Sequence, residues 1–352
     1  MKIQFAFATV HKCGGPWLLA AAAGAFMLGS SDAAEPQAPL GLPAIFWPDD
    51  NLYSDDKVEL GRLLYFDKRL SSDGTVACAS CHSSEFAFTD GRAFSSGIGG
   101  QVGGRSAPTV INSGYRTNQF WDGRVPSLKE QAKGPIANDI EMTHENDPQR
   151  AFETSIDRLK EVNGYVDRFE KVFGTKDFTI DHVAKAIATF ERTILSGNAP
   201  YDRYKAGDKS AMSESQVRGM DVFFNTTKCD SCHLGFNFTD SSYANVGIGM
   251  DKPNPDLGRF NVSQDEEDKG AFKTPTLREI ANTGPYMHDG RFKTLEEVIE
   301  HYDVGGIKNP YLDRRIKALK LSEQEKKDLV AFLKALSGEG WQHIKAPKTF
   351  PE

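Results

Sequence analysis

The sequence predicts a mainly α-helical fold of two tandem domains with long loops. Three observations lead to this prediction. Apolar residues recur at helical spacing in several segments, strand-like alternation is scarce, and the pentapeptide CxxCH occurs at residues 78–82 and again at 229–233. A motif repeated that far apart is typical of tandem domains, and 352 residues is the length of two ordinary domains.

The helices expected ahead of the two motifs are amphipathic. Residues 57–67 precede the first motif and residues 213–225 precede the second, where Ser213 and Gln216 stand in capping-box positions. Further helices are expected at 147–162 with Pro148 at the first helical position, at 181–195, and at 322–338 with Ser322 and Glu325 at the start and Gly338 at the end.

Residues 1–34 have the layout of a secretory signal peptide. Two lysines come first, an apolar stretch runs from Trp17 to Gly29, and small residues lead to Ala33 and Ala34. The apolar stretch is too short to cross a bilayer comfortably, so we expect cleavage after Ala33 or Ala34 and export to the periplasm. An uncleaved anchor is the alternative, and no later segment is apolar enough to cross a membrane.

The charge balance argues against nucleic acid as a partner. The chain has 42 basic and 49 acidic residues and a net charge of −7. A polyanion would be repelled by such a surface, whereas a basic electron-transfer protein would be attracted to an acidic face.

The cysteines predict two covalently bound haem groups. Apart from Cys13, which lies in the leader, they form two pairs, and a histidine follows each pair at once. In c-type haem attachment two thiols bond to the porphyrin and the adjacent imidazole binds the iron. The residues concerned are Cys78, Cys81 and His82 in the first motif and Cys229, Cys232 and His233 in the second.

Other uses of the four cysteines explain less. An exported protein often forms two disulfides, but these would leave both histidines unexplained. A zinc site would have to collect ligands from distant parts of the chain, and a thiol redox motif is expected in a βαβ setting that neither flank resembles.

Two glycine-rich stretches, residues 91–126 and 234–275, are expected to be long loops that wrap flat cofactors. The predicted domains are therefore two cytochrome c-like haem domains. They run from 35 to 205 and from 206 to 352, and the join lies near residues 196–210.

The sixth ligand of each iron decides what chemistry is available. A haem with two strong axial ligands carries electrons, whereas one with an open face can bind peroxide or oxygen. No histidine lies between His82 and His144, so we expect the first haem to be open, with Met142 and His144 as alternatives that would close it.

Tyr302 is the candidate ligand of the second haem. In the predicted helix that begins after Thr294, Tyr302 continues the apolar stripe, while His301 is turned away by about 100 degrees. Periodicity alone favours an ordinary core tyrosine.

The order of motifs resembles one known family over essentially the whole mature chain. A first CxxCH is followed by "FWDGR", "EM", a second CxxCH and "KTPTLREIANTGPYMHDGRF". This arrangement is similar to the bacterial di-haem cytochrome c peroxidase and MauG family, in its MauG-like form. In that family the sixth ligand of the C-terminal haem is methionine in the peroxidases and tyrosine in MauG, and Tyr302 stands at that position.

The resemblance also implies roles for other residues. The haem on His82 would react with peroxide, and the haem on His233 would store or pass electrons. Trp121 matches a tryptophan between the haems, and Glu141 matches an acidic residue that moves protons in the peroxide pocket, where Gln131 and Pro135 match further positions. A calcium ion between the haems would take oxygens from Thr283 and Pro285, but its side-chain ligand, asparagine in relatives, is Ser106 here.

Three activities remain open. The first uses hydrogen peroxide to oxidise residues of a partner protein, as in maturation of the tryptophan tryptophylquinone of the methylamine dehydrogenase precursor, and an oxygen ligand such as Tyr302 favours it. The second reduces peroxide with electrons from a small cytochrome c or a cupredoxin. Thr227 and Lys228, which stand where a relaying tryptophan would precede the second motif, weaken the first, although Trp341 is another candidate. The third is a di-haem electron carrier that is not an enzyme.

Overall fold

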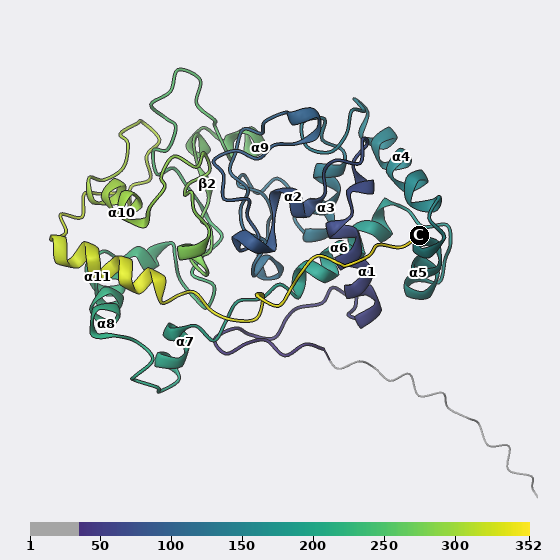
Figure 1. Cartoon of the computed structure of the whole chain (residues 1–352). Helices are drawn as coiled ribbons and strands as arrows, with labels where there is room; N and C mark the ends of the chain where they lie inside the picture. Colours follow the sequence, from purple (N-terminus) through teal and green to yellow (C-terminus); the bar gives the residue numbers. More distant parts are fainter. Residues whose placement is uncertain (1–34) are drawn as a thin grey trace, which may run out of the picture. The chain divides into compact units, whose positions relative to one another are not determined.

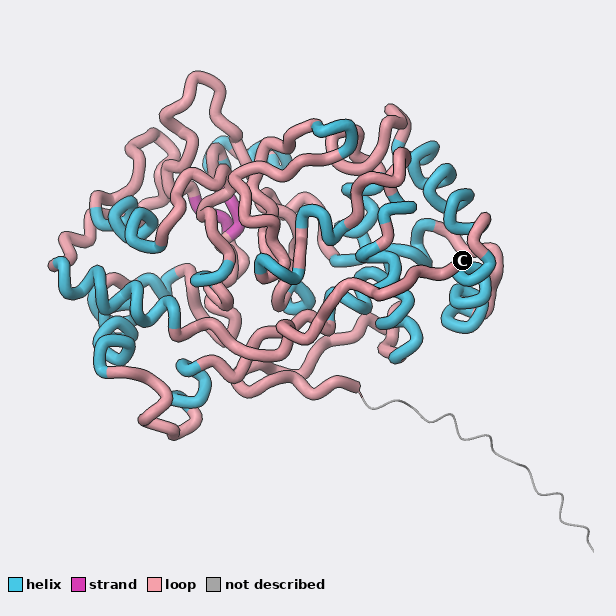
Figure 2. The backbone as a smooth tube through the Cα atoms, viewed as in Figure 1, coloured by secondary structure: helices cyan, strands magenta, loops and turns pink. Residues whose placement is uncertain are grey.

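Helices form nearly all of the regular structure of the chain (Figures 1 and 2). The computed structural model describes residues 35–352, so the predicted signal peptide, residues 1–34, lies outside the described residues. Within the described part, the strands are β1 (Tyr243–Ala244) and β2 (Phe272–Lys273), which pair antiparallel. The predicted mainly α fold is confirmed, and no helix of residues 35–352 has the length and apolarity needed to cross a bilayer.

The α-helices of the described residues vary from one turn to more than three turns. They are α1 (Asp55–Phe66), α2 (Cys78–Cys81), α3 (Leu128–Ile136), α4 (Pro148–Lys160), α5 (Asn163–Phe173), α6 (Ile180–Arg192), α7 (Pro200–Lys205), α8 (Glu214–Asp221), α9 (Phe260–Ser263), α10 (Leu295–Asp303) and α11 (Glu323–Lys334). A π-helical turn, Val222–Thr226, continues α8. Short 3-10 helices are formed by Lys68–Leu70, Ser84–Phe86, Ile98–Gly100, Ser113–Tyr115, Cys229–Ser231, Glu266–Asp268 and Ile280–Asn282.

Helix starts follow the local sequence closely. The predicted capping boxes form at α8 and α11, where Ser213 and Ser322 accept hydrogen bonds from backbone N–H groups three residues on. The end of α11 differs from prediction, because it stops at Lys334 rather than at Gly338. A Cβ at Gly338 would collide with the backbone of Gly197, so this glycine permits a close approach of two segments.

Each of two helix pairs crosses at a glycine. α1 packs against α6, and a Cβ at Gly61 would collide with the carbonyl of Ala186. α8 packs against α11, and a Cβ at Gly219 would collide with the carbonyl of Asp328. The helices of each pair can therefore approach backbone to backbone, and each pair contributes to a separate cluster of buried apolar side chains.

The C-terminal segment returns to the cluster that contains α1 and α6. In Figure 1 the chain after α11 runs across the molecule towards α5 and α6. Ile344 is buried in this first cluster, Arg69 Nη1 donates to Pro351 O at 2.9 Å, and Gly164 N donates to Glu352 O at 2.8 Å. Residues 341–352 therefore complete the core of the N-terminal helices.

The segment between the two motifs is anchored by a buried ion pair. Asp202 on α7 accepts hydrogen bonds from Arg278 Nη1 at 2.6 Å and Nη2 at 2.8 Å, and both residues are almost fully buried. The predicted join at residues 196–210 is thus packed in place. The described residues form one compact unit, and the division into domains 35–205 and 206–352 stays a prediction.

Replacing Asp202 with alanine is expected to lower the free energy of unfolding by about 3–5 kcal/mol, because the Arg278 charge would remain buried without its partner. Denaturant unfolding monitored by circular dichroism measures this change. The control is Asp177→Ala, which removes an exposed partner of Lys160 and is expected to cost less than about 1 kcal/mol. Equal losses in the two variants would contradict a structural role for the buried pair.

Candidate functional site

The first CxxCH motif presents a histidine prepared to bind a metal. Cys78 and Cys81 bound the single turn α2, and His82 follows directly. His82 Nδ1 lies 3.3 Å from Phe88 O, and the Tyr65 hydroxyl donates to His82 O at 2.8 Å. A carbonyl beside Nδ1 keeps the proton there and leaves the Nε2 lone pair for a metal.

The second motif repeats this arrangement. His233 Nδ1 lies 3.1 Å from Phe238 O, and Cys229 and Cys232 lie in the turn before it. Burial lowers the pKa of both His82 and His233, which favours the neutral imidazole that binds metals. The donors at each motif therefore fit haem c.

The alternative uses of the cysteines are not supported. All four thiols are free, and burial raises the pKa of each, that of Cys81 to about 11. In residues 35–352 no group of three or more histidine, cysteine and acidic side chains is placed to hold a metal.

The first cavity brings the four predicted catalytic residues together. It has a volume of about 580 Å³ and is lined by His82, Trp121, Gln131, Pro135 and Glu141. α3 supplies Gln131 and Pro135, and the turn after α3 supplies Glu141. Residues far apart in sequence thus surround one space beside the first motif.

Glu141 is held at the cavity by its surroundings. Asn138 Nδ2 donates to Glu141 Oε1 at 3.1 Å, and Ile98 N donates to Glu141 O at 3.0 Å. A Cβ at Gly97 would collide with the backbone of Ile140, so a glycine is needed for the loop to approach this closely. Burial raises the pKa of Glu141, and the charge of Arg124 opposes the increase.

Neither residue that was considered as a second ligand for the first haem reaches the cavity. Met142 is buried in the first apolar cluster, and His144 is exposed with its Nε2 4.0 Å from Asp73. Among the described residues that line the first cavity, His82 is the only histidine, and there is no methionine or tyrosine. The space facing His82 is therefore open to a small ligand.

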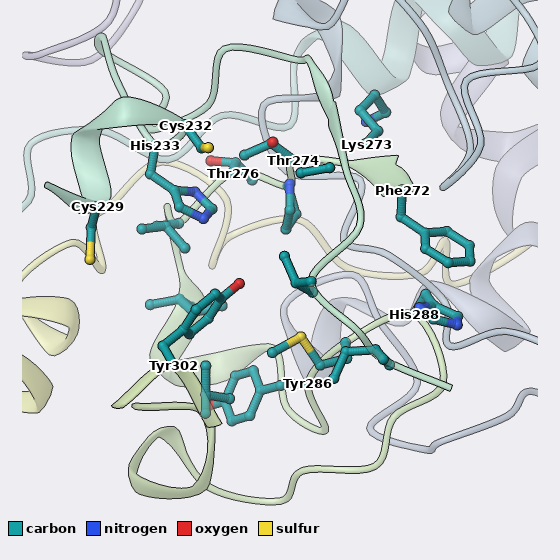
Figure 3. A pocket seen from close by; sticks show the side chains of 18 of the residues that line it. Cys229, Cys232, His233, Phe272, Lys273, Thr274, Thr276, Tyr286, His288 and Tyr302 are labelled. Carbon is teal, nitrogen blue, oxygen red and sulfur yellow. The ribbon is translucent and has the colours of Figure 1, made fainter. Parts of the chain in front are cut away.

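The second cavity is closed by Tyr302. It has a volume of about 250 Å³ and is lined by Cys229, Cys232, His233 and Tyr302. Figure 3 shows the phenol of Tyr302 extending from α10 into the cavity towards the imidazole of His233. Burial raises the pKa of Tyr302 well above its usual value, with no compensating hydrogen bond from the described residues. A phenol in this setting fits a metal ligand opposite His233.

Other potential ligands near the second cavity differ in placement. His301 does not line the cavity, because its Nε2 lies 2.9 Å from Val246 O. Met287 and His288 do line it, at the side away from α10 in the case of His288 (Figure 3). Of the two candidate ligands that Figure 3 labels, His288 and Tyr302, Tyr302 is the one that extends towards His233.

The two cavities share one wall. Ser106 N donates to His288 O at 2.7 Å, and Lys273 N donates to Trp121 O at 2.8 Å. Trp121 Nε1 also donates to Ser106 O at 2.8 Å. Seven residues line both cavities, namely Ser106, Ala107, Pro108, Thr109, Arg116, Phe120 and Trp121. Trp121 therefore lies between the two spaces.

The wall contains two copies of one turn. The first copy runs from RSAPT (105–109) to FWDGR (120–124), and the second runs from FKTPT (272–276) to MHDGR (287–291). In this alignment Ser106 corresponds to Lys273, and Trp121 corresponds to His288. The residues before Trp121 and His288 both have positive φ, +67° at Phe120 and +73° at Met287. The reciprocal hydrogen bonds follow from this internal repeat.

The predicted calcium ligands, Ser106, Thr283 and Pro285, all line the second cavity, and Ser106 alone of them also belongs to the shared wall. The Ser106 hydroxyl donates to Arg92 O at a long 3.4 Å. The geometry brings the three residues to one cavity without establishing a bound cation.

Three residues of the cavities were not singled out from the sequence. Arg116 lines both cavities, Glu191 lines the first and Lys273 lines the second. Comparing the chain with itself would have placed Arg116 and Lys273 on the repeated turn. In the sequence, Glu191 can be recognised only as an acidic residue at the end of the long apolar face of α6.

Comparison with known proteins agrees with this site. Residues 55–210 match the family described as di-haem cytochrome c peroxidase. The methylamine utilization protein MauG of Methylorubrum extorquens is 39% identical over 337 residues, covering 93% of this chain and 92% of that protein. Cytochrome c551 peroxidase of Nitrosomonas europaea is 40% identical over 286 residues, covering 81% of this chain and 80% of that protein.

A solved structure, described as a MauG-like protein associated with microbial copper homeostasis, is similar throughout. Its TM-score is 0.81 at 33% identity, covering 90% of this chain and 98% of that chain. Relatives named MauG and relatives named peroxidases thus both match over most of their length. The chain belongs to the di-haem cytochrome c peroxidase family of oxidoreductases, which implies haem c as its cofactor.

Proposed function

We propose that this protein uses hydrogen peroxide, bound at the first haem, to oxidise residues of a partner protein in the manner of MauG. The observation that carries the proposal is the contrast between the two cavities. Tyr302 extends towards His233 in the second, whereas the described residues that line the first include no histidine other than His82, no methionine and no tyrosine. One site is arranged for a substrate and the other for electron storage.

The residues of the first cavity transfer protons during peroxide cleavage. Haem iron with an open face supplies the redox chemistry of peroxide cleavage. Converting peroxide to two waters consumes two protons and two electrons, and a proton must move from one peroxide oxygen to the other. The Glu141 carboxylate accepts that proton and returns it to the departing oxygen, while the Asn138 amide holds the carboxylate in position.

The residues of the second cavity and of the shared wall stabilise an oxidised iron and transfer electrons. A phenolate oxygen from Tyr302 stabilises an oxidised iron more than a methionine sulfur does. Trp121 stands in the shared wall, where its indole N–H is fixed by Ser106 O. We assign Trp121 to electron transfer between the two sites.

The proposed partner is a protein, and because neither cavity is large enough to admit a folded substrate, its electrons must enter through the surface. A quinoprotein precursor is the proposed class, by analogy with the relatives named as methylamine utilization proteins. The predicted signal peptide and the requirement for haem attachment support a periplasmic location.

The second candidate is a peroxidase that takes electrons from a small cytochrome c or a cupredoxin. The match to cytochrome c551 peroxidase at 40% identity favours it, as does the absence of a tryptophan at Thr227 and Lys228. Trp341 offers a different route for electrons between a docked protein and the first site. Its ring lies 6.2 Å from that of Phe88, and the carbonyl of Phe88 contacts His82. A simple electron carrier is disfavoured by the open first cavity.

The Glu141→Gln variant is expected to react with peroxide about 10²- to 10⁴-fold more slowly, because the amide cannot accept the proton. The rate of the change in haem absorbance after mixing with peroxide measures this. Burial raises the pKa of Glu141, so the wild-type rate falls with decreasing pH through a pKa above the usual value for glutamate, as the carboxylate becomes protonated. The control is Glu85→Gln, an exposed glutamate near the first motif. An unchanged rate in Glu141→Gln would remove this residue from the mechanism.

Tyr302→Phe is expected to change the absorption spectrum of the second haem and to shorten the life of the peroxide-oxidised protein, because the oxygen ligand is lost. Stopped-flow and electron paramagnetic resonance spectra measure both effects. The matched control is Tyr286→Phe, in the same cavity. A spectral change in Met287→Leu but not in Tyr302→Phe would identify a sulfur ligand. Rapid wild-type turnover with reduced cytochrome c, without a long-lived oxidised form, would establish the peroxidase instead.

We also propose one calcium ion between the haems, bound by backbone oxygens of Thr283 and Pro285 and by Ser106. Removing it with a chelator is expected to slow the reaction with peroxide, and Ca²⁺ but not Mg²⁺ is expected to restore the rate, because irregular oxygen sites suit the larger ion. Metal analysis and calorimetry check this. Ser106→Ala should bind Ca²⁺ more weakly than Ser210→Ala, and protein that contains no calcium would contradict the proposal.

A further inference from the structure

Arg116 is a buried cation in the shared wall without an anionic partner. Its Nη2 donates to Thr109 O at 3.0 Å and Ile111 O at 3.4 Å, and its buried Nε has no hydrogen-bond partner. The other arginines lining the first cavity, Arg105 and Arg124, both pair with Asp122. Of the three, Arg116 alone forms no ion pair with the described residues, although the charge of Glu191 opposes the lowering of its pKa by burial.

Lys273 presents the same situation in the second cavity. Its side chain is only 7% exposed, and it forms no ion pair with the described residues. Burial and the nearby charge of Arg116 lower its pKa to about 7. Apart from Arg116, the other cations of this cavity are exposed or paired, as Arg315 is with Asp313.

Two neutral donors accompany Arg116 on the side of the first cavity. Ser113 Oγ and Glu191 Oε2 are buried, line this cavity and have no hydrogen-bond partner. Glu191 is 4% exposed, and burial raises its pKa to about 8 against the opposing charges of Arg192 and Arg116, which favours the protonated acid that can donate a hydrogen bond. Unpaired buried cations and donors of this kind are costly unless a ligand satisfies them.

We propose that Arg116 and Lys273 bind the carboxylates of the two haem groups, with Arg116 serving both cavities, Lys273 serving the second, and Ser113 and Glu191 completing the site in the first. This inference rests on the assignment of two haems in the proposed function. It goes further by giving the wall a charge that acts on both irons. A buried cation near a haem favours its reduced form, so Arg116 raises both reduction potentials and Lys273 raises that of the second haem.

The experiment measures the reduction potential of each haem in holoprotein carrying Arg116→Leu, Arg116→Lys or Lys273→Met. Arg150→Leu and Lys160→Met are the matched controls, because Arg150 is exposed, Lys160 is partly exposed, and both lie outside both cavities and belong to surface ion pairs. Haem content per chain is determined first, and the resonance Raman band of the haem carboxylates reports their hydrogen bonding directly.

We expect Arg116→Leu to lower both potentials and to shift the carboxylate bands of both haems. Lys273→Met should lower the potential of the second haem alone, and Arg116→Lys should stay close to wild type. Neither control variant should change the reduction potential or the carboxylate band of either haem. If Arg116→Leu does not fold, Lys273→Met carries the test.

Potentials and carboxylate bands equal to those of the controls would overturn the inference. These measurements need no peroxide. A wild-type protein inert to peroxide would end the proposed function while leaving shifted potentials to support the carboxylate site.

Discussion

The shared wall depends on a reciprocal pair of backbone hydrogen bonds, from Ser106 N to His288 O and from Lys273 N to Trp121 O. Each half of the chain supplies the donor of one bond and the acceptor of the other. Since buried backbone groups must be paired, neither turn can move away without leaving polar groups unsatisfied. The indole between the cavities, and the separation of the two sites, are therefore set by main-chain geometry rather than by side-chain packing alone.

The internal repeat places different chemistry at equivalent positions. Trp121 corresponds to His288 and Ser106 to Lys273, while Arg116 corresponds to Thr283. One half therefore contributes an aromatic ring and a guanidinium to the wall, and the other contributes an imidazole and an amine. Proximal histidines are held alike in both halves, so the repeat preserves cofactor attachment and differs in what surrounds each cofactor.

The parts of the site that could be read from the sequence are those with local causes. The CxxCH spacing is imposed by covalent chemistry, and the capping boxes by hydrogen bonds within four residues. Residues 121, 131, 135 and 141 were assigned by resemblance, and they line one cavity. By contrast, the lack of an ion pair at Arg116 and the raised pKa of Glu191 depend on which groups lie nearby in space. The approach of Gly97 to Ile140, and the end of α11 before Gly338, depend on distant segments in the same way.

The C-terminal segment has a consequence for the order of folding. Ile344 fills the N-terminal apolar cluster, and Pro351 and Glu352 accept hydrogen bonds from Arg69 and Gly164. These residues follow α11 in the chain, so the N-terminal helices cannot complete their core until this distant segment has packed against them. The first attachment motif is consequently presented on an unfinished half until the C-terminal segment is in place.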